Sequence, residues 1–503
     1  MIIKVNQIKS IKRFFHLLIL FFLLKINCFS QGFNHQWLLG NTWNNTFPKA
    51  RMFFDTSSYI LQQEYRDMVF EGAEATICDA NGNFLMSSNG VWIANANNDT
   101  MLNGKGLNPG WDVSAHPHAL LEDYGNIFLP FPGDSSKYVL IHSVKTNQFA
   151  IDPMRIYKSV IDITFDSGLG AVTQKNDTIF EDTLSWGIAA CKHANGRDWW
   201  IVTVTDGNPT IYKMLLTPTG IASITTQPLN FQPNTWGNAA QITFSQDGKK
   251  FIYCSPINQT QSGTVLLTDF DRCSGMFSNE QVIPVSSNAY VWGLTFSPSG
   301  QYVYACTSNY IFQIDVNTLT VYTVATYDGF CFPNNPWCTT FWNMYLAANG
   351  KIYITSGSGV QHIHEMNYPD SADTACDVQQ HAIFLNVWNL RAVPNHPNYY
   401  LGCDTTSGCT CLTSIEEPNK HDFKFSISPN PNNGNFKIIY LLPQNKNGKL
   451  EIFDVTGKKV YSQNLPQWST LQQINVSQLS GGIYAVRIVS GNFSTTAKII
   501  LQK

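Results

Sequence analysis

The stretch "LTFSPSGQYVYAC", residues 294–306, places two short apolar segments on either side of Ser299-Gly300. A polar residue followed by glycine between two apolar runs is a hairpin signal, because glycine takes a positive φ at little cost. Nearly the same phrase, "ITFSQDGKKFIYC", stands at 242–254 with Asp247-Gly248 at its centre. The repetition predicts that one hairpin-containing unit recurs along the chain.

The same pattern extends through most of the sequence. Further copies centre on Asn81-Gly82, Tyr124-Gly125, Asn195-Gly196 and Asn349-Gly350, with a looser copy, "RAVPNHPNYYLG", at 391–402. The glycine-to-glycine intervals are 43, 71, 52, 52 and 50 residues, and about 47 to the last copy, close to the length of a four-stranded propeller blade. The interval of 71 residues predicts an insertion.

One such unit cannot bury both faces of its sheet, so copies must pack around a common axis. We therefore expect an all-β protein in which residues 31–413 form a seven-bladed β-propeller. A pair of two-sheet sandwiches is the alternative, which the number of closely spaced turns disfavours.

The two phrases resemble the "FSPDGKxLYV" element of many bacterial propellers, a blade type that implies no activity. The matching residues are Phe244, Ser245, Asp247, Gly248, Lys249 and Tyr253 in one copy and Phe296, Ser297, Pro298, Gly300, Tyr302 and Tyr304 in the other. The segment from Glu71 to Gly110 is similar to the opening of a group of secreted propeller proteins from Bacteroidota. That likeness implies secretion and names no ligand.

Composition is typical of an exported β-rich protein. Charged residues and aromatic residues each make up 13% of the chain, and the formal net charge of −3 disfavours nucleic-acid binding. Residues 1–30 are typical of a secretory signal peptide, because basic residues precede an apolar run from Phe14 to Leu24. A lipoprotein anchored through Cys28 is the alternative, and no membrane helix is expected in the mature chain.

The last part of the chain has a different pattern. Residues 414–424 form a polar linker, and residues 425–503 alternate apolar and polar positions between turns, as in a small Ig-like β-sandwich. This segment resembles the type A C-terminal sorting domain of the Bacteroidota type IX secretion system over its whole length. The matching residues are Pro429, Asn430, Pro431, Gly434, Ile452, Asp454, Gly457, Val460, Leu479, Gly482, Tyr484, Val486 and Lys498.

That resemblance implies an export route and a set of partners. The chain would cross the inner membrane by its signal peptide and the outer membrane by the type IX machinery. A sortase would then cut within 414–424 and leave the product released or attached to the outer-membrane surface. An ordinary adhesion-type sandwich is the alternative.

Cysteines fit an oxidising compartment, since eleven remain after the signal peptide is removed. We expect one disulfide between Cys331 and Cys338 and another within the group Cys403, Cys409 and Cys411. The cysteines inside strand phrases, Cys191, Cys254 and Cys306, are predicted to be free and packed.

Four tryptophans precede the predicted inner strands by similar distances, and they are Trp186, Trp236, Trp292 and Trp342. In equivalent places of successive blades they should gather at one end of the central channel. There they could stack on sugar rings or grip a peptide. The alternative is that each one only fills the space between neighbouring blades.

Catalysis is not the first interpretation, because no catalytic set, metal site or cofactor motif can be assembled. His362 with His364, His116 with His118, and Glu71 with Glu74 are unspecific pairs. We expect a glycan- or protein-binding module, the alternatives being a polysaccharide hydrolase or lyase and a structural part of a surface assembly. Short motifs resembling Bacteroidota O-glycosylation acceptors centre on Thr100, Thr178, Thr183, Ser371, Thr374 and Thr405.

Overall fold

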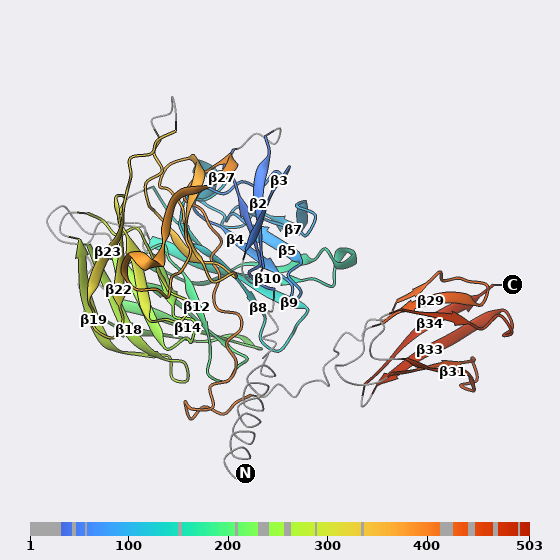
Figure 1. Cartoon of the computed structure of the whole chain (residues 1–503). Coiled ribbons are helices and arrows are strands. Elements are labelled where there is room, and N and C mark those ends of the chain that lie inside the picture. Colours follow the sequence, from blue (N-terminus) through green and yellow to red (C-terminus); the bar gives the residue numbers. More distant parts are fainter. Residues whose placement is uncertain are drawn as a thin grey trace, which may run out of the picture. The chain divides into compact units, whose positions relative to one another are not determined.

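The computed structural model forms two compact units, Met1–Thr413 and Ser414–Lys503 (Figure 1). The predicted signal peptide and the whole of the predicted linker, residues 414–424, lie outside the described residues. These are 32–42, 47–55, 58–148, 153–206, 210–229, 241–255, 263–286, 289–332, 337–412, 426–440, 448–465, 471–490 and 493–502.

Four antiparallel sheets of the first unit contain four strands each, in sequence order. The first contains β12 (Ala189–Lys192), β13 (Trp199–Val204), β14 (Thr210–Thr217) and β15 (Gly220–Pro228), and the second contains β16 (Ile242–Phe244), β17 (Lys250–Ser255), β18 (Gly263–Asp271) and β19 (Met276–Ser286). The third contains β20 (Gly293–Phe296), β21 (Tyr302–Cys306), β22 (Tyr310–Asp315) and β23 (Val321–Thr326). The fourth contains β24 (Met344–Leu346), β25 (Ile352–Ile354), β26 (Val360–Met366) and β27 (Val378–Asn389).

The N-terminal strands form a three-stranded and an eight-stranded sheet. The first contains β1 (Gln36–Leu39), β2 (Lys49–Phe54) and β3 (Tyr59–Glu64). The second joins β4 (Ala75–Cys78), β5 (Phe84–Ser88), β6 (Trp92–Ala94) and β7 (Thr100–Lys105) to β8 (Asn126–Pro130), β9 (Lys137–Lys145), β10 (Pro153–Asp162) and β11 (Ala171–Thr183). Its two halves meet at one parallel pairing of Leu102 with Ala171. The described part of the chain also contains the short helices α2 (Trp111–Ala115), η1 (Asp166–Gly168) and η2 (Asp373–Cys376).

The sheets of the first unit are arranged as in a β-propeller. First strands lie against one another in the pairs β1 and β4, β4 and β8, β12 and β16, β16 and β20, and β20 and β24. Apolar clusters join each sheet to the next, because side chains from both neighbours are buried together. Another cluster joins β1–β3 to β24–β27, which closes the ring.

The repeated phrases occupy the predicted place in this ring. Each forms the first two strands of a sheet, joined by a turn in which the glycine N–H donates to a serine carbonyl. Gly248 donates to Ser245 at 2.8 Å and Gly300 donates to Ser297 at 2.9 Å, both glycines with positive φ. The prediction of a recurring hairpin is therefore confirmed.

Tyr124-Gly125 was expected to be one of these hairpin turns, and that prediction is wrong. The pair precedes β8, and the turn from β8 to β9 contains Gly133, which has a φ of +77°. With Gly133 in the series, the glycine intervals become 51, 63, 52, 52 and 50 residues. The remaining long interval reflects long strands, since β10 has 10 residues and β11 has 13.

The looser copy at 391–402 is also not a hairpin. It contains no strand, and it contacts the inner strands of several sheets. The Asn395 amide donates to the carbonyls of Tyr124 and Ile188, and the Tyr399 hydroxyl donates to the carbonyl of Phe128. Pro394 and Pro397 lack the N–H groups that a sheet ladder needs. The segment therefore packs between the first strands as a plug, and β1–β3 supplies the sheet that the sequence reading missed.

Two sheets form the second unit, in the manner of a small sandwich. One contains β28 (Ser426–Ser428), β29 (Asn435–Ile439) and β32 (Leu471–Asn475), and the other contains β30 (Gly448–Phe453), β31 (Lys459–Leu465), β33 (Gly482–Ser490) and β34 (Phe493–Leu501). Side chains from both sheets share one apolar core that includes Phe436, Ile452 and Val486.

Three disulfides are present among the described cysteines. Cys331 bonds to Cys338, Cys403 bonds to Cys411, and Cys273 bonds to Cys409. The third bond joins the turn between β18 and β19 to the chain after the plug, and spacing gave no signal for it. The free cysteines within the described ranges are all buried, and they are Cys78, Cys191, Cys254, Cys306 and Cys376.

Candidate functional site

Three of the four predicted tryptophans are described, and Trp236 lies outside the described residues. Trp186, Trp292 and Trp342 each come just before the first strand of a sheet, β12, β20 and β24 respectively. All three are partly exposed. They therefore start from the same end of the ring, where the first strands begin.

Trp292 and Trp342 stack on each other. Their ring centroids are 4.0 Å apart and their planes differ by 15°. Gly357 allows this arrangement, because a Cβ at that position would lie 2.4 Å from the Trp342 ring. The indole N–H of Trp292 donates to Ser308 Oγ at 3.1 Å, and that of Trp342 donates to Asp123 Oδ2 at 3.3 Å.

Two cations lie against the ring of the third tryptophan, Trp186. Lys145 Nζ is 4.6 Å from the ring centroid, and the guanidinium carbon of Arg391 is 5.8 Å from it. Lys145 is the last residue of β9, and Arg391 begins the plug segment. Cations near an indole face are attracted by the quadrupole of the indole. This attraction helps to hold both side chains at the end of the ring of sheets where Trp186 lies.

A buried carboxyl group lies next to each of the two cations. Arg391 Nε forms an ion pair with Asp123 Oδ1 at 2.8 Å, and Lys145 Nζ lies 3.8 Å from Glu122 Oε1. Asp123 also accepts the Trp342 N–H, so it links Arg391 to the stacked pair. We call Trp186, Trp292, Trp342, Lys145, Arg391, Glu122 and Asp123 the aromatic-ionic cluster.

Burial changes the acidity of both carboxyl groups in this cluster. It raises the pKa of Glu122 to about 8, an effect that neighbouring Asp112 increases and Lys145 opposes. It also raises the pKa of Asp123, while Arg391 and hydrogen bonds lower it. Near neutral pH Glu122 is therefore mostly protonated.

Asp112 extends the polar region beyond the cluster. It is buried in α2, its Oδ1 lies 2.8 Å from His116 Nδ1, and its Oδ2 accepts the Lys145 backbone N–H at 3.3 Å. His118, the other histidine of that predicted pair, is exposed. Neither Glu122 nor Asp123 was predicted as a site residue from the sequence, because both lie in the phrase around Tyr124-Gly125 that was expected to form a hairpin.

The remaining pairs singled out from the sequence are not brought together as ligand sets. His364 is buried, which lowers its pKa to about 3, and its Nδ1 accepts the backbone N–H of His381. Glu74 is fully buried, and burial raises its pKa well above the ordinary value, whereas Glu71 is partly exposed. Across the described ranges, no three His, Cys, Asp or Glu side chains are arranged to hold a metal ion.

The sequence motifs of the second unit mostly shape turns and strand ends. The Asn430 amide pairs with the last strand by donating to the Lys498 carbonyl and accepting the Ile500 N–H, both at 2.9 Å. Asp454 caps the turn that ends at Gly457, whose φ is +81°. A Cβ on Gly434 would lie 2.6 Å from Ser477 Cα, so only glycine fits there.

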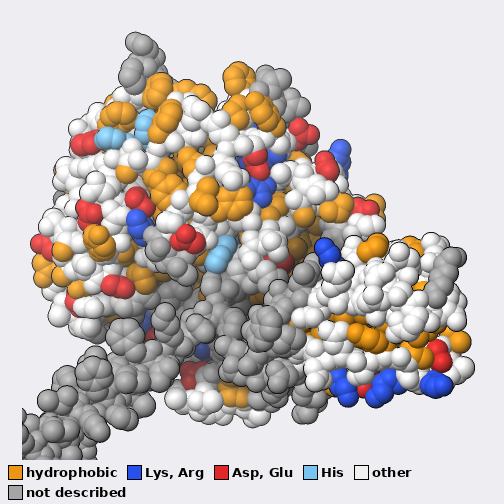
Figure 2. All heavy atoms as spheres, turned by 45° about the vertical axis from the view of Figure 1, so that its right-hand side comes forward, with side chains coloured by type: hydrophobic (Ala, Val, Ile, Leu, Met, Phe, Trp, Pro, Cys, Tyr) orange, Lys and Arg blue, Asp and Glu red, His pale blue; other side chains and the backbone are white. Residues whose placement is uncertain are grey.

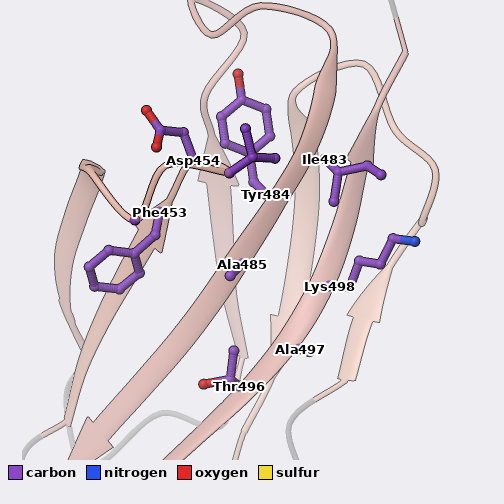
Figure 3. Close-up of a pocket in the computed structure, with 10 residues that line it drawn as sticks. Phe453, Asp454, Ile483, Tyr484, Ala485, Thr496, Ala497 and Lys498 are labelled. Atoms are coloured by element: carbon purple, nitrogen blue, oxygen red, sulfur yellow. The ribbon is translucent and has the colours of Figure 1, made fainter.

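Several motif residues also line one hollow of about 470 Å³ in this unit (Figure 3). Its walls come from the end of β30 and from β33 and β34, and they include Asp454, Tyr484 and Lys498. Ile483 in this wall is 48% exposed. The hollow is open and largely apolar.

Cationic side chains gather along one side of the second unit, beside a strip of hydrophobic side chains (Figure 2). Three cations surround Glu451, with N–O distances of 2.7 Å to Arg487, 3.1 Å to Lys459 and 3.9 Å to Lys449. These pairs lower the pKa of Glu451, with hydrogen bonds from Arg487 and Lys459 as the main causes. Glu451 and the three cations together form a charged network on the surface of the second unit.

Most of the predicted glycosylation acceptors are at the surface. Thr100, Thr178, Thr374 and Thr405 are exposed, while Thr183 and Ser371 are partly buried. In the portion that the structure describes, no helix is long and apolar enough to cross a membrane.

Comparison with known proteins assigns the second unit. Residues 426–502 match the family model described as a secretion system C-terminal sorting domain, the domain of the type IX secretion system. This confirms the resemblance drawn from the sequence and implies secretion across the outer membrane. No curated protein matches the chain.

Solved structures resemble the chain at low sequence identity. A periplasmic gluconolactonase from Pseudomonas aeruginosa is 11% identical with a TM-score of 0.37, and the match covers 88% of this chain and 99% of that chain. A hypothetical selenium-binding protein from Sulfolobus tokodaii is 8% identical with a TM-score of 0.39, covering 72% and 92%. Hydrazine synthase from Kuenenia stuttgartiensis is 10% identical with a TM-score of 0.32, covering 71% and 96%.

Proposed function

We propose that this protein, which carries a type IX sorting domain, is a secreted seven-bladed propeller that binds a glycan at the aromatic-ionic cluster. The sorting domain would be removed by a sortase within 414–424, leaving the propeller of residues 31–413 released or attached to the cell surface. The observation that carries the binding site is the gathering of three partly exposed tryptophans with two cations at one end of the ring.

The sheets support seven blades. Four sheets would each be one blade, the halves β4–β7 and β8–β11 of the eight-stranded sheet would be two more, and β1–β3 would be the seventh. The plug occupies the space between the inner strands, so the ligand would bind at the mouth and would not pass through.

Glycan binding suits the chemistry of the cluster better than catalysis does. Indole rings present an apolar face to the C–H side of a sugar, and nearby Lys and Arg donors can hydrogen-bond its hydroxyl groups. A general acid has to come within about 3 Å of the bond that it protonates. Glu122 and Asp123 have side chains only 1% and 2% exposed, so the site favours holding a sugar over cleaving it.

The test is a panel of surface and extracellular polysaccharides scored for binding and for product release together. We expect binding without release, and weaker binding by at least tenfold for Trp186→Ala and Trp292→Ala variants that remain folded. Trp337→Ala is the matched control, because that tryptophan is 53% exposed and lies outside the cluster. Product release, or equal binding by all four proteins, would contradict the proposal.

A further inference from the structure

In the aromatic-ionic cluster the two cationic side chains are more exposed than the two carboxyl groups. The side chains of Lys145 and Arg391 are 19% and 17% exposed, whereas those of Glu122 and Asp123 are 1% and 2% exposed. The two cations are therefore more accessible to a ligand at Trp186 than either carboxyl group is.

Both cations are positioned by more than their carboxylate partners. Arg391 Nη2 donates to the Leu121 carbonyl at 2.9 Å, and the Arg391 carbonyl accepts hydrogen bonds from Asn343 and Thr355. Lys145 is fixed at its backbone by Asp112. Preorganised cations lose little conformational entropy when a ligand binds, which favours affinity.

We propose that the ligand of this site is an anionic glycan, whose carboxylate or sulfate group is bound by Lys145 and Arg391 while a sugar ring packs on Trp186. This inference rests on the proposed glycan-binding function and adds the charge class of the ligand. An arginine and a lysine beside an aromatic face supply charge-assisted hydrogen bonds to such a group. Neutral sugars would use only the hydroxyl contacts.

The overall charge of the protein does not favour anionic ligands, because the whole chain has a formal net charge of −3. A preference for anions would therefore have to come from a local arrangement. Lys158 offers a matched comparison, since its side chain is also 19% exposed and pairs with Asp177 at 2.9 Å on another part of the unit.

The experiment measures binding of the full protein to two matched pairs of polymers. Polygalacturonate is compared with its methyl ester, and dextran sulfate with dextran, so each pair shares a backbone and differs in charge. We expect both anionic polymers to bind at least tenfold more tightly than their neutral partners, with an affinity that falls as salt rises. Lys145→Gln should lower the ratio of the affinities for the anionic and the neutral polymer about tenfold, and Lys158→Gln should leave this ratio unchanged.

A double variant guards against loss of folding. Lys145→Gln with Glu122→Gln removes the cation and replaces its buried neighbour with a side chain that cannot ionise, so no unpaired charge can form inside, and it should show the same loss of preference. Equal affinity within both polymer pairs, with binding still lost in Trp186→Ala, would overturn the charge inference and leave glycan binding standing. Failure of every polymer to bind would overturn both.

Discussion

The protonation state of residues in the aromatic-ionic cluster depends on burial as well as on the type of side chain. Glu122 is an ordinary carboxyl group in the sequence, yet burial and the neighbouring Asp112 keep it protonated near neutral pH. Lys145 and Arg391 stand 246 positions apart in the numbering and meet at Trp186. The charge that the cluster presents depends on which ionisable groups are buried and which are left accessible.

The raised pKa of Glu122 predicts a pH dependence of stability. Its ordinary value is 4.5 and its folded value is about 8, so between these the folded state keeps a proton that the unfolded state has lost. Stability therefore falls as pH rises through this window, by up to about 1.4 kcal/mol per pH unit from this group. Glu122→Gln should remove that slope and be more stable than the wild type at pH 9.

Chemical denaturation between pH 5 and pH 9 measures this effect. Glu181→Gln is the control, because the Glu181 side chain is 37% exposed and pairs with Arg155 at the surface. A Glu122→Gln variant whose stability stays parallel to the wild type over the whole range would show that Glu122 is ionised throughout.

At the scale of elements, the repeated phrase connects neighbouring sheets as well as forming a hairpin. Its final cysteine donates to the carbonyl of the tryptophan that precedes the next sheet, with Cys254 Sγ 4.0 Å from Trp292 O and Cys306 Sγ 2.7 Å from Trp342 O. Gly293 allows the close approach, because a Cβ there would lie 2.1 Å from Trp342 O. The positions of two tryptophans in the cluster are thus coupled to the packing between sheets.

The disulfide from Cys273 to Cys409 should be the strongest covalent contribution to the first unit. It closes a loop with a sequence separation of 136 residues and fastens the chain that follows the plug. Loop-closure entropy predicts about 5 kcal/mol for such a loop and about 2.5 kcal/mol for one of 7 residues. Replacing both cysteines by serine should therefore lower the free energy of unfolding by about twice as much as the same change at Cys331 and Cys338.

Denaturant titration of the two double variants gives this comparison under identical conditions. Equal losses would mean that residual structure in the unfolded chain, and not loop length, sets the contribution of each bond.

For the whole molecule, the two compact units have separate apolar cores. We expect calorimetry of the full chain to show two unfolding transitions, one matching isolated residues 426–503 and one matching residues 31–413. Separate cores and a short intervening segment allow each unit to unfold alone. A single transition that appears in neither fragment would contradict this independence.

Local patterns in the sequence were enough for the sorting domain and for most of the repeated hairpins. Turn glycines at 248 and 300 require positive φ, and motif positions such as Gly434 and Asp454 shape tight turns, so each signal depends only on near neighbours. Such requirements depend on only a few neighbouring residues, so they can be predicted without knowledge of the fold.

The tertiary structure alone decided what fills the ring and what surrounds its tryptophans. "RAVPNHPNYYLG" has the apolar and turn residues of a hairpin, but its partners are inner strands far away in the chain. Glu122, Asp123, Lys145 and Arg391 come together only because the closing of the ring brings distant segments to one end and buries the two carboxyl groups. Burial and long-range pairing are properties of the folded ring, so no local pattern could have indicated them.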